Sequence, residues 1–187
     1  MKSLFITLLM IFTLTTFTQG QGLNVGDKVP SFEALTDEGS NWNLNNNLEK
    51  DYLVVYFYPA AMTGGCTAQA CAYRDLNNNL EAKNAKVVGV SGDKPENLKF
   101  FKKAHNLNFT LLSDPKGDIA KKFGVPLRDG GTYKGEFKGE NFELSRDVTT
   151  NRWTFIIDKE GKIVYKNDKV DAAKDSEQVL SFLEKNS

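Results

Sequence analysis

The chain contains two cysteines, Cys66 and Cys71, which lie five positions apart in the segment CTAQAC. A polar, flexible turn, Thr63-Gly64-Gly65, precedes Cys66, and the sequence after it has helix-forming composition with apolar residues at helical spacing. We therefore expect Cys66 in the first turn of a helix. There, unpaired backbone N–H groups and the positive end of the helix dipole favour a thiolate over a thiol. Because the thiolate is the attacking form of cysteine, the pattern predicts a reactive thiol.

A helix terminus alone is a weak activator of such a thiol. An unperturbed cysteine has a pKa near ~8.5, and each unit of lowering requires about 1.4 kcal/mol of preference for the charged form. Helix dipoles contribute roughly 0.3 to 2 kcal/mol, so we expect a cation to assist. By composition alone, Arg74, Arg128 and Arg152 are candidates for that task.

The elements that must hold these residues can be predicted from the hydrophobic pattern. The run YLVVYFY over residues 52–58 indicates a buried strand that ends at Pro59, just before the cysteine segment. The later elements are expected to be a strand over 86–92, a helix from Pro95 to His105, a strand over 109–114, a short helix ending at Gly124, a hairpin of WTFIID and KIVYKN, and a terminal amphipathic helix SEQVLSFLEK. Strands that alternate with helices and end in a hairpin predict an α/β fold, with a mixed central sheet and helices on both faces.

The secondary structure of two regions is harder to predict from the sequence. Residues 127–151 are rich in glycine and charge, and short alternating patches there predict an extended insertion or an extra hairpin. A solvated loop and a flap over the site remain alternatives for this region. The asparagine clusters NWNLNNN and LNNNL indicate turns and a polar helix face.

Pro59, Thr63 and Cys66 form a P-x-x-x-T-x-x-C pattern that resembles the active-site motif of the peroxiredoxins, which are thiol peroxidases with a thioredoxin-like fold. A second cysteine five positions on, Cys71, is similar to the bacterioferritin comigratory protein branch, also called peroxiredoxin Q. The order of segments from about residue 26 to about residue 168 matches the family as well. Gly64 departs from the branch, which commonly has proline there, and so loosens the loop before Cys66. The resemblance implies a three-layer α/β/α sandwich.

The resemblance also implies a role for each residue of the motif. Cys66 would be the peroxidatic cysteine that attacks the peroxide O–O bond and becomes a sulfenic acid. Thr63 would present its hydroxyl to the thiolate and the bound peroxide, and Pro59 would shield the site from water. Arg152, in RWTFIID, matches the family's arginine and would stabilise both the sulfur anion and the leaving oxygen. Cys71 would be the resolving cysteine that forms a Cys66–Cys71 disulfide.

A structural disulfide is the alternative reading of this cysteine pair in an exported protein. The loop it would close is very short, so it would constrain the unfolded chain little. The catalytic reading has a geometric consequence, since five residues of ideal helix separate two Cα atoms by about 8.7 Å whereas a disulfide needs less than about 7 Å. We therefore predict that the first turns of this helix unwind during each catalytic cycle.

Three functional classes follow from these residues. The first is a thiol peroxidase that reduces hydrogen peroxide or alkyl hydroperoxides and is recycled by a thioredoxin-like dithiol partner. The second is an exported protein disulfide oxidoreductase, although that class normally carries C-x-x-C. The third is a copper-holding metallochaperone, for which two cysteines and the remote His105 are a sparse ligand set. We expect neither a cofactor nor a metal, and we expect His105 to be a cation or a packed side chain at its helix end.

The N-terminal residues predict export. Lys2 is followed by an apolar stretch to about Phe17 and a small polar exit, the pattern of a secretory signal peptide over residues 1–20. The remainder, 21–187, is expected to form one domain in the periplasm or outside the cell. Removal of Lys2 leaves 23 basic and 24 acidic residues, a net charge of −1, which attracts neither nucleic acid nor an anionic membrane. Since both cysteines belong to one chain, catalysis does not require a dimer and we expect a monomer.

Overall fold

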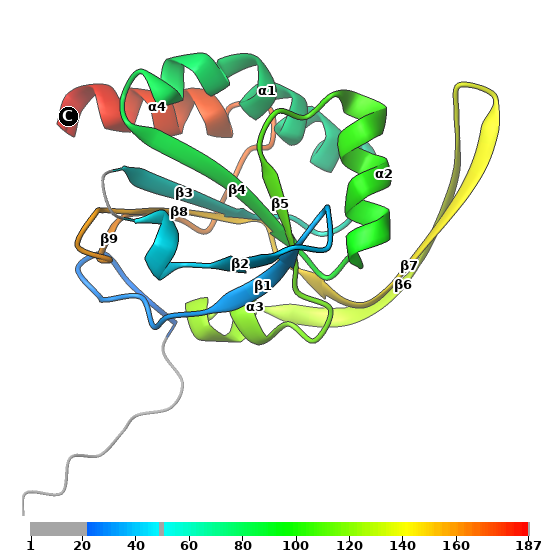
Figure 1. Cartoon of the computed structure of the whole chain (residues 1–187), viewed down its shortest axis with the longest axis horizontal. Coiled ribbons are helices and arrows are strands. Elements are labelled where there is room, and N and C mark those ends of the chain that lie inside the picture. Colours follow the sequence, from blue (N-terminus) through cyan, green and yellow to red (C-terminus); the bar gives the residue numbers. More distant parts are fainter. Residues whose placement is uncertain (1–21, 49–50, 187) are drawn as a thin grey trace, which may run out of the picture.

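A seven-stranded mixed sheet forms the centre of the computed structural model, which describes residues 22–48 and 51–186 (Figure 1). The strand order is β2-β1-β5-β4-β3-β8-β9. The strands of this sheet are β1 (Glu33–Thr36), β2 (Asn41–Asn43), β3 (Tyr52–Phe57), β4 (Ala85–Ser91), β5 (Thr110–Ser113), β8 (Trp153–Ile157) and β9 (Ile163–Asn167). The helices are α1 (Gly64–Glu81), α2 (Pro95–His105), α3 (Asp118–Phe123) and α4 (Asp175–Asn186). The predicted signal peptide lies outside the described residues.

The central strand β3 separates two hydrophobic cores because its side chains alternate between the faces of the sheet. Val54 and Tyr56 belong to the core under α1, α2 and α4, whereas Leu53, Val55 and Phe57 belong to the core on the side of α3. Figure 1 shows α1, α2 and α4 on one side of the sheet and α3 on the other. The predicted α/β fold with helices on both faces is therefore confirmed.

The direction of the strands brings distant parts of the chain to one edge of the sheet. β3, β4 and β5 are parallel neighbours, so their carboxyl ends and the loops that follow them meet at the same edge. β8 runs antiparallel to β3, with Trp153 opposite Phe57. The start of β8 therefore lies beside the end of β3, and the segment that leads to Cys66 meets the segment that carries Arg152.

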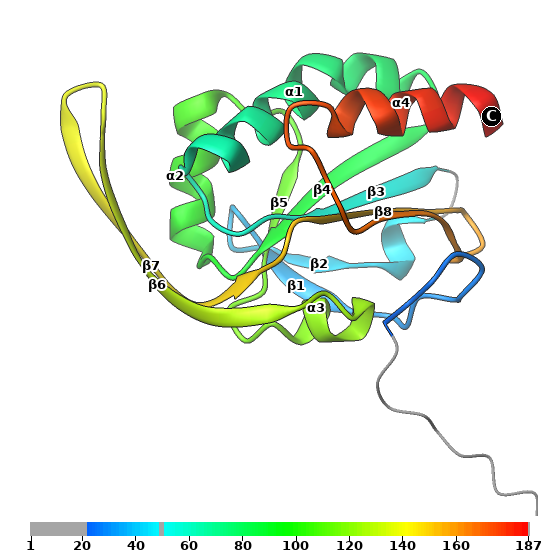
Figure 2. The same cartoon turned by 180° about the vertical axis from the view of Figure 1, so that it is seen from behind.

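Residues 127–151 contain a long antiparallel hairpin of β6 (Leu127–Phe137) and β7 (Glu140–Thr150). In Figures 1 and 2 this hairpin extends beyond α2, outside the body of the domain. Its inner side packs on α2, where the ring of Phe100 lies 6.5 Å from Phe137 and 5.4 Å from Phe142. The predicted extra hairpin is confirmed, and the alternative of a loop is wrong because the two halves of the segment pair as antiparallel strands.

The other predicted elements of the domain are confirmed to within one or two residues at most ends. The cluster NWNLNNN is an exception. Asn41–Asn43 forms strand β2, and turn-like structure is confined to a 3-10 turn at Asn45–Asn47. Strand β2 could not be predicted from the sequence because Trp42 is its one buried side chain, and a single buried residue does not make an alternating pattern. No helix in the described part of the chain is long and apolar enough to span a membrane.

Candidate active site

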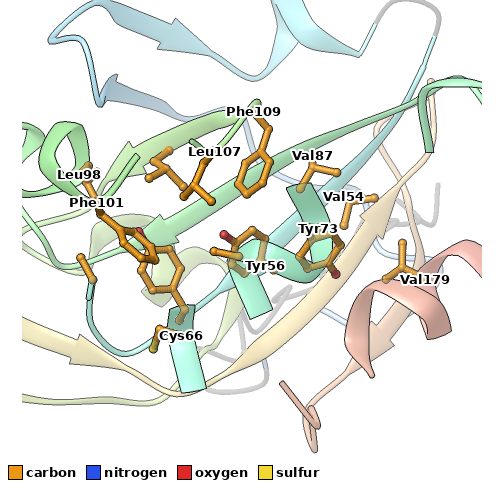
Figure 3. Packing of buried hydrophobic residues seen from close by; sticks show 14 of the residues in the cluster. Val54, Tyr56, Cys66, Tyr73, Val87, Leu98, Phe101, Leu107, Phe109 and Val179 are labelled. Carbon is orange, nitrogen blue, oxygen red and sulfur yellow. The ribbon is translucent and has the colours of Figure 1, made fainter. Parts of the chain in front are cut away.

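Cys66 is the third residue of α1 and its side chain is buried, as predicted for a first-turn position. Thr63 precedes the helix in an extended conformation, with φ −79° and ψ 150°, and its carbonyl oxygen accepts the hydrogen bond from Thr67 N. The amides of Gly64, Gly65 and Cys66 come before that bond, so helix geometry gives them no intrahelical acceptor. These N–H groups and the helix dipole favour negative charge near the sulfur. Figure 3 shows Cys66 at one end of the core cluster that contains Tyr56 and Tyr73.

The cation at this sulfur is Arg152. Its Nη2 donates a hydrogen bond to Cys66 Sγ at 3.3 Å, and its Nη1 donates to Gln69 Oε1, one helical turn further along α1. Arg152 is only partly buried and directly precedes β8, whose pairing with β3 brings it to the start of α1. A guanidinium keeps its charge at any working pH, so it can stabilise both a thiolate and an oxyanion next to it.

The loop between β3 and α1 is anchored by Asp93, a fully buried carboxylate after β4. Asp93 Oδ2 accepts hydrogen bonds from the amide of Ala61, at 2.8 Å, and from Ser91 Oγ. Its Oδ1 pairs with Arg146 of β7 at 2.9 Å. Met62 follows with φ 66°, a conformation that non-glycine residues rarely adopt. The base of the hairpin thus holds the backbone that leads into α1.

Thr63 and Pro59 flank this loop. Thr63 Oγ1 donates a hydrogen bond to the carbonyl oxygen of Ala60 at 2.9 Å, which uses its proton and leaves its lone pairs as acceptors. Pro59 is half-buried between the end of β3 and the loop. The structure therefore gathers Thr63, Cys66 and Arg152 around the N-terminus of α1, with Pro59 at the entrance of the same segment.

Cys71 lies further along α1, half-buried and unpaired with Cys66 in this reduced structure. Its neighbour is Arg74, whose pKa is raised mainly by the hydrogen bond to Asp75. Burial opposes this rise, and the charge interaction and hydrogen bond with Cys71 add to it. Arg74 Nη1 also donates to the carbonyl oxygen of His105. Of the three candidate arginines, Arg152 contacts Cys66, Arg74 lies beside Cys71, and Arg128 sits on the exposed part of β6.

His105 ends α2 with its ring packed between Phe101 and Phe137, each at 5.4 Å. Burial lowers its pKa, and the charge of Arg74 lowers it further. Of the two sequence-based alternatives, the packed side chain therefore describes His105 better than the cation. Among residues 22–48 and 51–186, no group of three His, Cys, Asp or Glu side chains is placed to hold a metal ion.

Sequence reasoning missed a buried polar group behind Arg152. Asp175 Oδ2 accepts hydrogen bonds from Gln69 Nε2 at 2.7 Å, Tyr73 Oη at 2.7 Å and Thr154 Oγ1 at 2.8 Å. Gln69 was detectable in principle, because position i+3 from Cys66 shares its helix face. The local sequence marks Asp175 only as an acidic residue at the start of a helix. Its partners are distant in the chain: those in α1 lie about 100 residues away, and the one in β8 lies 21 residues away.

This arrangement supports nucleophilic chemistry by sulfur. It contains a thiol at a helix N-terminus, a permanent cation within hydrogen-bond distance of that thiol, and a second thiol in the same helix. The cation and the N–H groups lie where negative charge would pass from sulfur to a leaving oxygen, which is the requirement for electrostatic stabilisation of such a displacement.

Comparison with known proteins identifies relatives over most of the chain. A model of the AhpC/TSA family matches residues 25–166. The chain is 36% identical over 161 residues to a protein named Peroxiredoxin Bcp from Escherichia coli (strain K12), a match that covers 86% of this chain and 96% of that protein. It is 40% identical over 147 residues to a protein named Peroxiredoxin Q, chloroplastic, from Populus jackii, covering 78% of this chain and 61% of that one.

A solved structure gives the same result for the fold. The crystal structure of Peroxidoxin BcpB from Mycobacterium tuberculosis superposes with a TM-score of 0.74 at 30% identity, covering 88% of this chain and 99% of that chain. The fold described above is therefore shared with that protein.

Proposed function

The chain belongs to the AhpC/TSA family and is a thiol-dependent peroxidase with a thioredoxin-like fold, and we propose that Cys66 is the thiol that attacks the peroxide. The observation that carries this proposal is the contact of Arg152 Nη2 with Cys66 Sγ at the N-terminus of α1. The cation and the helix terminus act on the same sulfur, which is what an activated cysteine needs.

In the proposed reaction, the Cys66 thiolate attacks one oxygen of the peroxide and the O–O bond breaks. The sulfur gains that oxygen and becomes a sulfenic acid, while the other oxygen leaves with the bonding electrons and takes up a proton as water or an alcohol. Arg152 stabilises the negative charge as it moves from the sulfur to the leaving oxygen. Thr63 Oγ1, whose proton is used by Ala60, accepts a hydrogen bond from the O–H of the peroxide.

Cys71 then resolves the sulfenic acid. Its thiolate attacks the Cys66 sulfur and the S–O bond breaks. The oxygen leaves as hydroxide and takes up a proton to become water, and a Cys66–Cys71 disulfide forms. Both cysteines lie within continuous helix in the reduced structure, so α1 must unwind locally for the two sulfurs to meet. A partner with a thioredoxin-like dithiol then reduces the Cys66–Cys71 disulfide to two thiols by thiol–disulfide exchange. The partner's own two thiols become a disulfide in the same reaction.

We also propose where the protein acts and in which oligomeric state. The signal-like residues 1–20 support export to the periplasm or beyond, and the presence of both cysteines in one chain supports a monomer that works without a partner's thiol. Hydrogen peroxide and alkyl hydroperoxides both carry the O–O bond and the O–H that the proposed contacts use.

The test is a stopped-flow reaction of the reduced protein with hydrogen peroxide, followed by tryptophan fluorescence and titration of free thiols. We expect rapid loss of both thiols in the parent protein, no rapid reaction in Cys66→Ser, and arrest at the sulfenic acid in Cys71→Ser. Oxidation no faster than that of free cysteine would contradict the assignment of Cys66. Efficient reduction of insulin disulfides in place of peroxide would favour the disulfide oxidoreductase instead.

A further inference from the structure

Asp175 is a fully buried carboxylate that no step of the proposed reaction uses. It begins α4, and its Oδ2 accepts hydrogen bonds from Gln69 and Tyr73 of α1 and from Thr154 of β8. The other oxygen, Oδ1, is buried without a hydrogen-bond partner. One atom therefore joins three elements, and one of its donors, Gln69, also touches Arg152.

The contact with Asp175 determines which way the amide of Gln69 faces. An amide has a donor end and an acceptor end, and only the donor end can face the accepting Oδ2. Its acceptor end, Oε1, then faces Arg152 Nη1, which can only donate. The reversed amide would place two acceptors together at Asp175 and two donors together at Arg152. Asp175 thus selects the one orientation of Gln69 that can hold the guanidinium.

The orientation does not depend on the protonation state of Asp175. Burial raises the pKa of this carboxyl, whereas the hydrogen bonds from Tyr73 and Gln69 oppose that rise. A proton on the unpartnered Oδ1 would leave Oδ2 free to accept. Burial also raises the pKa of Tyr73, so its hydroxyl stays protonated and remains a donor at neutral pH.

The guanidinium of Arg152 is planar, so holding one of its nitrogens directs the other. Nη1 is fixed by Gln69, and Nη2 then points at Cys66 Sγ, at 3.3 Å. Thr154, two residues after Arg152 in the chain, is tied to the same Oδ2 of Asp175. The strand that begins directly after Arg152 and the side-chain amide that holds its guanidinium are therefore both hydrogen-bonded to one buried oxygen.

We propose that Asp175 is a positioning residue for the peroxidase reaction, which orients Gln69 so that Arg152 is held against Cys66. The inference rests on the proposed roles of Cys66 and Arg152. A purely structural role for Asp175, holding α4 onto α1, makes a different prediction: its removal would lower stability and leave the reactivity of Cys66 unchanged.

The test measures alkylation of Cys66 by iodoacetamide between about pH 5 and about pH 9, in a Cys71→Ser background so that a single thiol reacts. In Asp175→Ala, we expect the midpoint of the pH profile to rise by about one unit and the rate at acidic pH to fall roughly tenfold. The matched control is Asp114→Ala, which removes another buried carboxylate, one that accepts from Ile119 N and Ala120 N at the start of α3. This control should lose stability and keep the parent profile.

A rescue variant tests the orientation itself. Glutamate at position 69 has two acceptor oxygens and no donor end, so it can hold Arg152 without being oriented. Asp175→Ala/Gln69→Glu should therefore regain the parent profile although its stability stays low. Failure of the glutamate to restore the profile, or a folded Asp175→Ala with an unchanged profile, would overturn the proposal.

A second variant covers the case in which Asp175→Ala does not fold. Asp175→Leu/Tyr73→Phe/Thr154→Val replaces the acceptor and two of its donors by apolar groups of similar shape, a change that buried polar clusters often tolerate. It leaves only Gln69 without its acceptor, so it should fold and show the shifted profile, and addition of Gln69→Glu should restore it. An unshifted profile would contradict the proposal. If Arg152→Gln also has the parent profile, then the proposed role of Arg152 has failed, independently of Asp175.

Discussion

Arg152 Nη2 lies 3.3 Å from Cys66 Sγ although 86 residues separate the two in the chain. The antiparallel pairing of β8 with β3 makes this contact, because it places Trp153 opposite Phe57 at the edge of the sheet where α1 begins. The same guanidinium also bonds Gln69, so its two terminal nitrogens serve two partners at once. A lysine has one nitrogen on a flexible stem and cannot reproduce this fork.

Arg152→Lys should therefore slow the reaction of Cys66 with hydrogen peroxide by about tenfold, and Arg152→Gln by about a hundredfold or more, because removing a positioned donor from a reacting anion costs rate on this scale. Stopped-flow fluorescence of the reduced variants measures both rates. Arg128→Gln, an exposed arginine on β6, is the control that should react at the parent rate. Equal rates for Arg152→Lys and the parent would show that the fork is not needed.

The contrast between Arg152 and Asp175 shows what the sequence could predict. The strand, turn and helix around Cys66 have local signals: β-branched and aromatic residues, a glycine pair and helical spacing. Arg152 could be found because its family motif places it directly before a readable strand. The three donors to Asp175 come from α1 and β8, and no local sequence pattern predicts that they lie close together.

The hairpin gives a second example. The alternation in TYKGEF and NFELS predicted that strands form there, since every second side chain faces one side. What those strands pack on could not be predicted, because it depends on the tertiary position of α2 and its Phe100. The buried pair of Arg146 and Asp93, which links the hairpin to the loop before Cys66, was hidden for the same reason.

A substitution at Gly64 should change the stability of the protein, because Gly64 is the first residue of α1 and the residues that follow it are helical. Thr63 has the extended φ and ψ that a residue before proline requires, and a Cβ at Gly64 would meet nothing within 4 Å apart from its chain neighbours and the adjacent helix backbone. Gly64→Pro should raise the free energy of unfolding by roughly 0.4 to 1 kcal/mol, chiefly by restricting the unfolded chain. Urea denaturation of the reduced protein measures this.

Gly64→Ala is the companion to that variant. It also restricts the unfolded chain and fits the same open space, but it keeps the amide hydrogen, so it should stabilise by a comparable or smaller amount. A loss of stability in Gly64→Pro beside a gain in Gly64→Ala would mean that the N–H of residue 64 has a partner that the proline removes.

The helix α1 should differ between the two redox states. Cys66 and Cys71 lie in continuous helix when reduced, and an ideal helix holds their Cα atoms about 8.7 Å apart, too far for a disulfide. Oxidation should therefore lower the far-UV helical signal and speed amide exchange in residues 64–75. Peroxide-treated Cys71→Ser, which stops before the disulfide, should keep the reduced pattern. Identical exchange in reduced and disulfide forms would rule out unwinding.

Arg146 should be a strong determinant of stability. It and Asp93 form a buried pair, with 6% and 0% of their side chains exposed, so Arg146→Leu leaves a buried carboxylate without its counter-ion. Breaking a buried pair in this way typically costs about 3 to 5 kcal/mol. The control is Lys134→Leu in the same hairpin, whose pair with Glu143 is 72% and 55% exposed and should be worth at most about 1 kcal/mol. Similar losses in the two variants, measured by urea denaturation, would contradict the role of Arg146.

His105 should make stability depend on pH near neutrality. Burial between Phe101 and Phe137 lowers its pKa in the folded state, first by desolvation and then through the charge of Arg74. The unfolded chain therefore takes up a proton on this residue at a higher pH than the folded protein does, so stability should fall as the pH drops from about 7.5 through about 6.5.

His105→Gln should flatten this part of the profile, because glutamine does not titrate. Asp114 and Asp175, whose pKa values are raised by burial, change stability in the opposite direction at lower pH, and they do so equally in parent and variant. The difference between the two urea denaturation series, recorded under reducing conditions at several pH values, therefore isolates His105. Parallel curves from about pH 7.5 to about pH 5.5 would show that the histidine is protonated as readily when folded as when unfolded.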